Sequence, residues 1–344
     1  MSAELNEIAE SARQIANAVG IAASADTVWP LIIELGLLQI AVPEQMGGLE
    51  QGLSGAAAIY RELGASLASG PYLAAMLAID AVCNSELPNR QQWVERMTGG
   101  NYATVALADC ALSLADDSKL SGFASAVSAA DQATHLLVFT EDASCVALVP
   151  NSAAGLTLTE RPTWDSTRRL YEARFDQVAV DEKLTLARGA TARKLVNRLL
   201  AHRDFALASD AVGGATTLLT MTVDYLQTRR QYSRPLALFQ ALKHRCADLK
   251  VQLAASIALL EDNLSRVNLE QLTALESLAR TAKYLACSTY STMAEEALQL
   301  HGGIAMTSEH SLHLFLKRAF LDEQLGRTSE AYELDIAAEL LAMC

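Results

Sequence analysis

The spacing of apolar residues divides the chain into stretches of different periodicity. Residues 1–100 have the pattern of short helices separated by glycine and proline, and from residue 186 onward apolar side chains recur every three or four positions. The clearest run predicts one face of a long helix: Leu242, Cys246, Leu249, Leu253, Ile257, Leu260 and Leu264. Further long helices are predicted over 194–228 and 271–300, so this region is expected to form an antiparallel helical bundle.

The middle of the chain has the pattern of a β domain. Short alternating or β-branched runs are separated by turn-forming residues and cover 103–108, 134–140, 145–150, 156–160 and 171–180. The sequence therefore predicts a mainly α protein with a small β domain. Its parts are an N-terminal helical domain at 1–100, a central β domain at 101–185 and a C-terminal helical bundle at 186–344.

Composition and charge narrow the class of protein. Aromatic residues make up only 6% of the chain, and alanine and leucine dominate, which favours helices over a sandwich or barrel. A net charge of −13 argues against a nucleic-acid partner. The N-terminus is acidic and amphipathic, and no uncharged apolar run reaches the roughly 18 residues of a membrane helix. Neither a signal peptide nor a membrane span is predicted.

The cysteines and histidines do not form a recognisable metal site. The six cysteines are scattered without a CxxC pair, so neither zinc nor a disulfide framework is expected, and a reducing cytoplasm fits best. His301, His310 and His313 lie close together in sequence, but no set of carboxylates or thiolates accompanies them. We interpret them as surface or interface histidines.

Two stretches of the predicted bundle combine arginine, glutamine, aromatic and glycine residues: TRRQYSRPLALFQALKHRCADL at 228–249 and EEALQLHGGIAMTSEHSLHLFLKRA at 295–319. Together with WDSTRRLYEARFDQVAV at 164–180 and LGLLQIAVPEQMGG at 35–48, they resemble the acyl-CoA dehydrogenase family. The resemblance spans roughly residues 28–330. It implies the family's fold, in which an N-terminal helical domain and a central β domain precede a C-terminal four-helix bundle.

The resemblance implies FAD as the cofactor and assigns six residues to it: Arg229, Tyr232, Gln240, Gln299, Gly302 and Gly303. Arg229 would meet the pyrophosphate, for which a guanidinium is suited because it donates paired hydrogen bonds and stays charged. The glycine segment would touch the flavin of a neighbouring subunit. The residues alone also allow simpler interpretations. Arg229 could complement the C-terminus of a helix, and Gly302 could cap one, although two consecutive glycines also permit close approach of a ligand.

The sequence lacks the acid that the family's reaction needs. That reaction removes a proton from the α carbon of an acyl thioester, and a hydride leaves the β carbon for the flavin, so a desolvated carboxylate must act as base. The family's two possible glutamate positions fall at Arg203 and Gly326 when the chain is aligned on 211–213 and 328–329. Neither residue can accept a proton. Asp204 is adjacent, but one residue along a helix turns a side chain by about 100°, so we expect it to point elsewhere.

The β domain departs from the family's pattern as well. The Thr-Glu-Pro-like turn that faces the flavin ring falls at Ala108-Asp109-Cys110, and the Trp-x-Thr step falls at Ala126-Val127-Ser128. We therefore predict that the half of the site that binds the ring is lost, whereas the half that reaches a neighbour's flavin is kept.

These features predict the non-catalytic subunit of a flavin-dependent heteromer. A homologous catalytic chain would hold the ring and supply the base, in an α2β2 heterotetramer that resembles the bacterial enzymes acting on steroid side-chain thioesters. The resemblance further implies an acyl-CoA substrate and an electron-transfer flavoprotein as electron acceptor. Two alternatives stay open. One is an active homomer with a relocated acid at Asp204, Glu323 or Glu330, and the other is a non-enzymatic acyl-CoA-binding or scaffold subunit without flavin.

Overall fold

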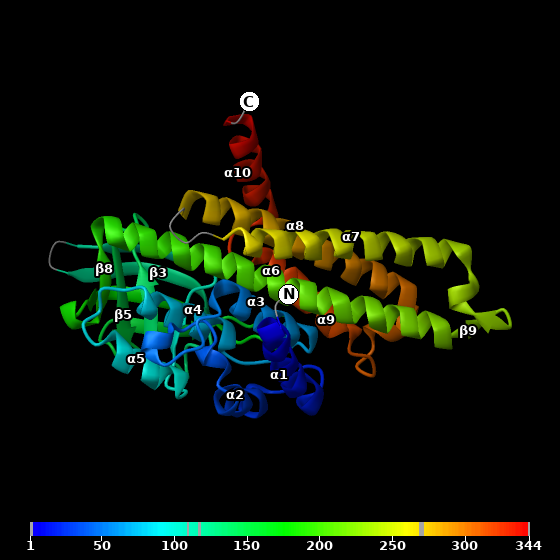
Figure 1. Ribbon diagram of the computed structural model, residues 1–344, viewed down its shortest axis with the longest axis horizontal. Coiled ribbons are helices and arrows are strands. Elements are labelled where there is room, and N and C mark those ends of the chain that lie inside the picture. Colours follow the sequence, from blue (N-terminus) through cyan, green and yellow to red (C-terminus); the bar gives the residue numbers. More distant parts are fainter. Residues whose placement is uncertain (1–2, 109, 116–117, 268–271, 343–344) are drawn as a thin grey trace.

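The computed structural model describes residues 3–108, 110–115, 118–267 and 272–342. Short helices form the first part of the protein (Figure 1). They are α1 (Ala3–Val19), α2 (Ala25–Glu34), α3 (Gly52–Ala65), α4 (Tyr72–Cys83) and α5 (Arg90–Thr98), with the 3-10 turns η1 (Leu37–Gln39) and η2 (Glu44–Met46) between α2 and α3. Every residue of α4 is buried, so this helix forms the centre of the N-terminal core.

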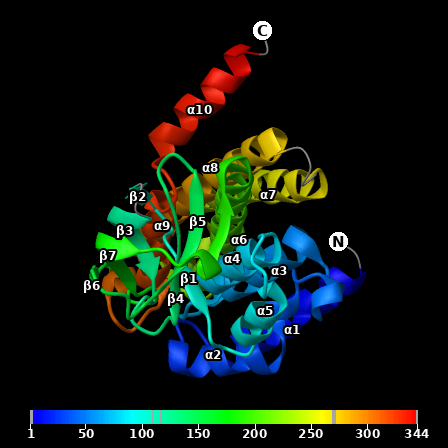
Figure 2. The same ribbon diagram turned by 90° about the vertical axis from the view of Figure 1, so that its left-hand side faces the viewer.

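Two four-stranded sheets follow (Figure 2). Their strands are β1 (Ala103–Val105), β2 (Cys110–Leu114), β3 (Lys119–Ser128), β4 (His135–Phe139), β5 (Cys145–Pro150), β6 (Leu156–Glu160), β7 (Leu170–Ala179) and, after the turn η3 (Glu182–Leu184), β8 (Thr185–Arg188). One sheet has the order β1-β4-β5-β8, with β1 parallel to β4, and the other has the antiparallel order β2-β3-β7-β6. Side chains of both sheets share one apolar core.

The strand β3 was not predicted, although it spans ten residues. Its sequence, KLSGFASAVS, is rich in serine, alanine and glycine, which have low β propensity. Pairing with β2 on one side and β7 on the other holds it in the sheet. The strands β2 and β8 were not predicted either; each pairs with one neighbour, β3 and β5 respectively.

Long helices make up the C-terminal part: α6 (Gly189–Thr228), α7 (Gln240–Ser265), α8 (Leu272–His301), α9 (Leu312–Gln324) and α10 (Ser329–Ala342). Between them lie β9 (Arg230–Gln231), β10 (Arg234–Pro235) and the turns η4 (Leu236–Leu238) and η5 (Gly302–Met306). The predicted face of α7 is confirmed, because Leu249, Leu253 and Leu260 are buried and the other four residues of the run pack against the same core. Helices α6 to α9 form the bundle, and α10 projects from it (Figures 1 and 2).

Two glycines in the middle of α6 allow its neighbours to pack closely. A Cβ added at Gly213 would lie 1.9 Å from the Arg61 carbonyl oxygen of α3, and one added at Gly214 would lie 2.4 Å from the Tyr290 hydroxyl of α8. A mid-helix glycine costs about 1 kcal/mol relative to alanine, and close packing on both sides of α6 offsets that cost. Among the helices of the described residues, none combines the length and apolarity that crossing a bilayer requires.

Candidate functional site

The two positions predicted for the family's base lie side by side. Arg203 comes from α6, and Gly326 lies in the turn between α9 and α10. A Cβ added at Gly326 would lie 3.3 Å from Arg203 Nη2 and 2.6 Å from the Tyr332 hydroxyl. Gly326 also has a φ of +80°, a conformation that side chains other than glycine rarely adopt. A glutamate at this position would therefore be strained and would collide with its neighbours.

The place where Arg203 and Gly326 meet is filled by the side chains of Arg203, Asp204 and Tyr332. Arg203 donates its Nε and Nη2 hydrogens to Asp204 Oδ1 at 3.0 and 2.9 Å, and the Tyr332 hydroxyl donates to the same oxygen at 2.9 Å. All three side chains are buried. Burial and the charge of Asp204 raise the pKa of Tyr332, so its hydroxyl keeps the proton that it donates. Asp204 follows Arg203 directly on α6, and the long arginine side chain bends back to pair with it.

The β domain meets the bundle at this place. The backbone N–H of Gly326 donates to the Leu107 carbonyl at 2.7 Å, and the N–H of Leu107 donates to the Ala126 carbonyl at 3.1 Å. These bonds connect the turn before α10 to Leu107 and Ala126, in the segments for which the sequence predicts a lost ring half. Ser128 keeps a hydroxyl but is buried, and Asp109 lies outside the described residues.

The other candidate acids have local partners or face solvent. Glu323 of α9 accepts hydrogen bonds from the Ser291 hydroxyl at 2.7 Å and the Ser329 hydroxyl at 3.0 Å. Glu330 is exposed in the first turn of α10. Asp204 is held in the ion pair with Arg203. None of these three carboxylates has the free, desolvated environment that a general base requires.

Next to this place, a buried ionic cluster joins the bundle to the β domain. Arg318 of α9 has no exposed surface; its Nε lies 2.7 Å from Asp165 Oδ2 and its Nη1 lies 3.1 Å from Asp210 Oδ2. Arg168 reaches Asp210 Oδ2 at 3.0 Å and Asp322 Oδ1 at 3.3 Å. Asp210 lies seven residues beyond Arg203, which is about two turns along the same face of α6. Sequence reasoning missed this cluster, because its members come from three distant segments.

The cluster contains three carboxyl groups but only two guanidinium groups. Burial by itself would raise the pKa of Asp210, but Arg168 and Arg318 outweigh it and lower the pKa to about 2. For Asp322, burial raises the pKa well above its usual value, and Arg168 offsets only part of that effect. The cluster therefore favours the neutral form of Asp322 and the ionised form of Asp210.

The predicted FAD-binding residues lie at the other end of α6. Arg229 directly follows the last residue of this helix, about 39 Å along the axis from Arg203. Tyr225 of α6 stacks on His301 of α8 with ring centroids 4.4 Å apart. The C-terminal ends of the two helices therefore meet, which brings the 228–249 and 295–319 motifs together at the end of the bundle that carries β9 (Figure 1).

All six predicted FAD-binding residues are exposed at this end: Arg229, Tyr232, Gln240, Gln299, Gly302 and Gly303. Within the described part of the chain, no hydrogen bond or ion pair reaches the Arg229 guanidinium. Tyr232 is 86% exposed at the tip of the β9–β10 hairpin. Both residues at that tip, Tyr232 and Ser233, have positive φ of 51° and 62°, as a two-residue type I′ turn requires. The turn therefore directs an aromatic side chain into solvent.

The two consecutive glycines have different local roles. Gly302 follows the end of α8 and has a φ of +66°, so the helix-cap interpretation accounts for it. Gly303 has no positive φ, and a Cβ added there would meet no atom within 4 Å. The described fold therefore has no steric need for glycine at position 303.

The interpretation of His301 as a surface residue was wrong. Its ring is 3% exposed, its Nδ1 lies 2.8 Å from the Ala297 carbonyl oxygen, and its ring packs edge-on against His310 at 4.9 Å. Burial lowers the pKa of His301, because the neutral ring is favoured there. Among the described residues, no group of three or more His, Cys, Asp or Glu side chains is placed to hold a metal.

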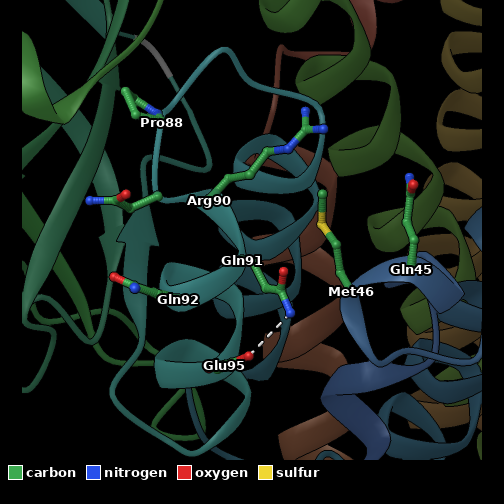
Figure 3. Close-up of a pocket in the computed structure, with 8 residues that line it drawn as sticks. Gln45, Met46, Pro88, Arg90, Gln91, Gln92 and Glu95 are labelled. Atoms are coloured by element: carbon green, nitrogen blue, oxygen red, sulfur yellow. Dashed lines mark hydrogen bonds between the residues drawn. The ribbon is translucent and has the colours of Figure 1, made fainter.

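A polar cavity lies elsewhere, between η2 and α5 (Figure 3). It has a volume of about 570 Å³ and is lined by amide and charged side chains that include Gln45, Arg90, Gln91 and Glu95. Gln91 turns toward Glu95, with 3.4 Å between Nε2 and Oε1 (Figure 3). None of its lining residues belongs to the predicted site.

Comparison with known proteins identifies the family. The model of the acyl-CoA dehydrogenase N-terminal domain matches residues 2–101, and that of the C-terminal domain matches residues 193–341. Acyl-CoA dehydrogenase IpdE2 of Mycobacterium tuberculosis is 32% identical over 302 residues, which cover 87% of this chain and 82% of that protein. Acyl-CoA dehydrogenase FadE28 of the same organism is 29% identical over 335 residues, covering 93% of this chain and 94% of that protein.

Solved structures agree over the whole chain. A chain of the ChsE4-ChsE5 complex from Mycobacterium tuberculosis superposes with a TM-score of 0.88 at 22% identity, covering 99% of this chain and 98% of that one. A variant of the Tcur3481-Tcur3483 steroid ACAD superposes with a TM-score of 0.86 at 25% identity, with the same coverage. The cofactor of the family is FAD. The two family models and the 32% identity to IpdE2 show that this chain belongs to the acyl-CoA dehydrogenase family.

Proposed function

We propose that this chain is the non-catalytic subunit of a heteromeric acyl-CoA dehydrogenase and completes the FAD site of a homologous catalytic chain. The main support for this proposal comes from the place where Arg203 and Gly326 meet. A thioester whose α carbon lay there would need a free carboxylate to take its proton. Instead, Asp204 forms a buried ion pair with Arg203. Burial by itself would lower the pKa of Arg203, but the negative charge of Asp204 outweighs that effect and raises the pKa above its usual value. Neither group is available as a base.

The opposite end of α6 supports the second part of the proposal, that this chain completes the FAD site of a partner chain. FAD, when bound, accepts the hydride that leaves the β carbon. The residues proposed to hold the cofactor of the partner chain are Arg229, Tyr232, Gln240, Gln299, Gly302 and Gly303. The unpaired guanidinium of Arg229 suits the pyrophosphate, since it donates paired hydrogen bonds and stays charged. The open space beside Gly303 would let the cofactor approach the backbone closely.

The comparisons support the choice of partner and substrate class. Two of the similar solved structures are named as pairs of different chains, ChsE4-ChsE5 and Tcur3481-Tcur3483, and the second is a steroid ACAD. We propose by analogy an α2β2 assembly in the cytoplasm that desaturates an acyl-CoA thioester with a steroid-derived side chain. Electrons would leave through an electron-transfer flavoprotein, as they do in the family.

Counting flavins in the co-expressed assembly tests the proposed function. A heterodimer would have one complete site, formed by the ring half of the partner and the pyrophosphate half of this chain, and its reciprocal site would lack a ring half. We expect two flavins per α2β2 assembly, measured from flavin absorbance and protein mass after gel filtration. Four flavins would contradict the proposal. A colourless complex would favour the scaffold alternative, and reduction of flavin by this chain alone with an acyl-CoA would favour a relocated base.

Replacing Arg229 with alanine is expected to weaken FAD binding in the heteromer about ten- to hundredfold, because a charge-assisted bond to phosphate contributes about 1.5–3 kcal/mol. Flavin release during dialysis, followed by fluorescence, measures the effect. Arg230→Ala is the matched control, since it removes the same charge from the adjacent exposed position, where the side chain already donates to the Ser233 carbonyl at 3.2 Å. Equal flavin retention in both variants would show that Arg229 only complements the helix end.

A further inference from the structure

Three aromatic rings join the ends of three helices beside the residues proposed to hold FAD. The ring of His301, the last residue of α8, stacks on Tyr225 of α6 with 4.4 Å between the ring centroids and 22° between the ring planes. The ring of His310, which lies just before α9, packs against His301 at 4.9 Å and 62°. These three side chains form a ring stack that connects α6, α8 and the start of α9.

The ring stack is connected directly to Arg229. The backbone N–H of Arg229 donates to the Tyr225 carbonyl at 2.8 Å, and the Arg229 carbonyl accepts from the N–H of Leu236 at 2.9 Å. Because Arg229 directly follows α6, its position depends on where the last turn of this helix lies. Stacking on His301 holds that turn against the end of α8.

The ring stack also closes the loop 302–309, which carries the two consecutive glycines. This loop begins directly after His301 and ends directly before His310, so the contact between the two histidine rings brings its ends together. His310 is itself held at the start of α9, because its Nδ1 accepts the N–H of Leu312 at 3.2 Å. The open space beside Gly303 therefore has a defined place relative to α8 and α9.

A hydrogen bond fixes the direction of the His301 ring. Its Nδ1 lies 2.8 Å from the Ala297 carbonyl oxygen, which can only accept, so Nδ1 carries the ring hydrogen. Burial lowers the pKa of His301 and favours the neutral ring. Nε2 then carries no hydrogen, and it has no hydrogen-bond partner among the described residues. The aromatic face, rather than the second nitrogen, is therefore what His301 contributes to the ring stack.

We propose that His301 is a positioning residue for the cofactor of the partner chain. Through Tyr225 it sets the place of Arg229, and through His310 it sets the place of Gly303. This inference rests on the proposed function, in which both of these groups reach the FAD of the partner. A guanidinium binds a phosphate through paired hydrogen bonds only in one geometry, so the ends of α6 and α8 must be fixed against each other. His301 needs no contact of its own with the cofactor.

FAD binding by the co-expressed heteromer tests this role. His301→Ala removes the ring and is expected to raise the dissociation constant for FAD about two- to tenfold, because a stacked aromatic pair contributes a free energy of that size. His301→Phe keeps a ring that can stack on Tyr225, so it should bind FAD as the wild type does. Tyr225→Ala removes the same contact from the half-buried side chain on α6 and should match His301→Ala. Flavin fluorescence during equilibrium dialysis measures all three variants.

A double-mutant cycle separates positioning from stability. In the Arg229→Ala background, the further effect of His301→Ala should be smaller than in the wild type, because part of that effect passes through Arg229. Met293→Ala is the matched control, since it removes a buried side chain about two turns before His301 in the same helix. It should lower the thermal unfolding temperature and leave the dissociation constant for FAD unchanged.

Three outcomes decide between the alternatives. If His301→Ala and Tyr225→Ala bind FAD as the wild type does while Arg229→Ala binds it more weakly, the positioning role is wrong and the proposed function stands. A loss of FAD in Met293→Ala as large as that in His301→Ala would also overturn the positioning role, because flavin release would then only follow stability. If Arg229→Ala itself retains FAD fully, the proposed half of the site is wrong, and the positioning role falls with it.

Discussion

Replacing Arg318 with alanine is expected to destabilise the chain by about 3–5 kcal/mol, because it leaves buried carboxylates without their partner. Arg318 is fully buried and contacts both Asp165 and Asp210. Without Arg318, the buried ion pairs that hold the β domain against the bundle would be lost. Chemical denaturation followed by circular dichroism at neutral pH measures the change. A loss below 1 kcal/mol would show that the cluster relaxes or admits water at little cost.

Asp322→Asn is the matched control in the same cluster. We expect it to change how the free energy of unfolding depends on pH. Since burial raises the pKa of Asp322 well above its usual value, folding takes up a proton at this residue. The folded state binds more protons than the unfolded state once the pH exceeds about 4, so stability falls by about 1.4 kcal/mol per pH unit up to the folded-state pKa. Asparagine is neutral at every pH. The variant should therefore lose the fall in stability that begins in the wild type as the pH rises above about 4.

Replacing Gly303 with valine is expected to remove most of the flavin from the heteromer while leaving the fold of this chain intact. A Cβ at position 303 meets no atom of the described chain within 4 Å, and the residue has no positive φ, so the isolated variant should unfold at the wild-type temperature. In the complex, the branched side chain would occupy the space through which the cofactor approaches the backbone. The absorbance ratio of flavin to protein after gel filtration measures the loss.

Graded substitution gives this experiment its control. Gly303→Ala adds one methyl group and should lower flavin content less than Gly303→Val does. Gly302 is unsuitable for comparison, because its φ of +66° would strain any side chain. If the Gly303→Val complex remains fully yellow, position 303 does not face the cofactor and the arrangement proposed for the two subunits is wrong.

The side chains of the candidate site meet through contacts between distant helices. The sequence pointed to Arg203 and Gly326 as the positions without a base, and the structure brings them to one place. It could not indicate the buried pairing of Arg203 with Asp204, because that pairing depends on how the long Arg203 side chain bends and on Tyr332, which arrives from α10. The buried state of His301 likewise follows from its stacking on Tyr225, a contact between distant helices.

The sequence by itself determined the elements whose pattern is local. The face of α7, the extents of α6 and α8, and the order of helical, β and helical regions follow from spacings of three, four or two residues, which depend only on the geometry of a single helix or strand. Tertiary structure decided what depends on partners. The strand β3 forms because β2 and β7 pair with it, and the charges of Arg168 and Arg318 are tolerated in the core because three distant segments supply their carboxylates. Periodicity cannot reveal such contacts, since burying a charge is favourable only when its partner is already in place.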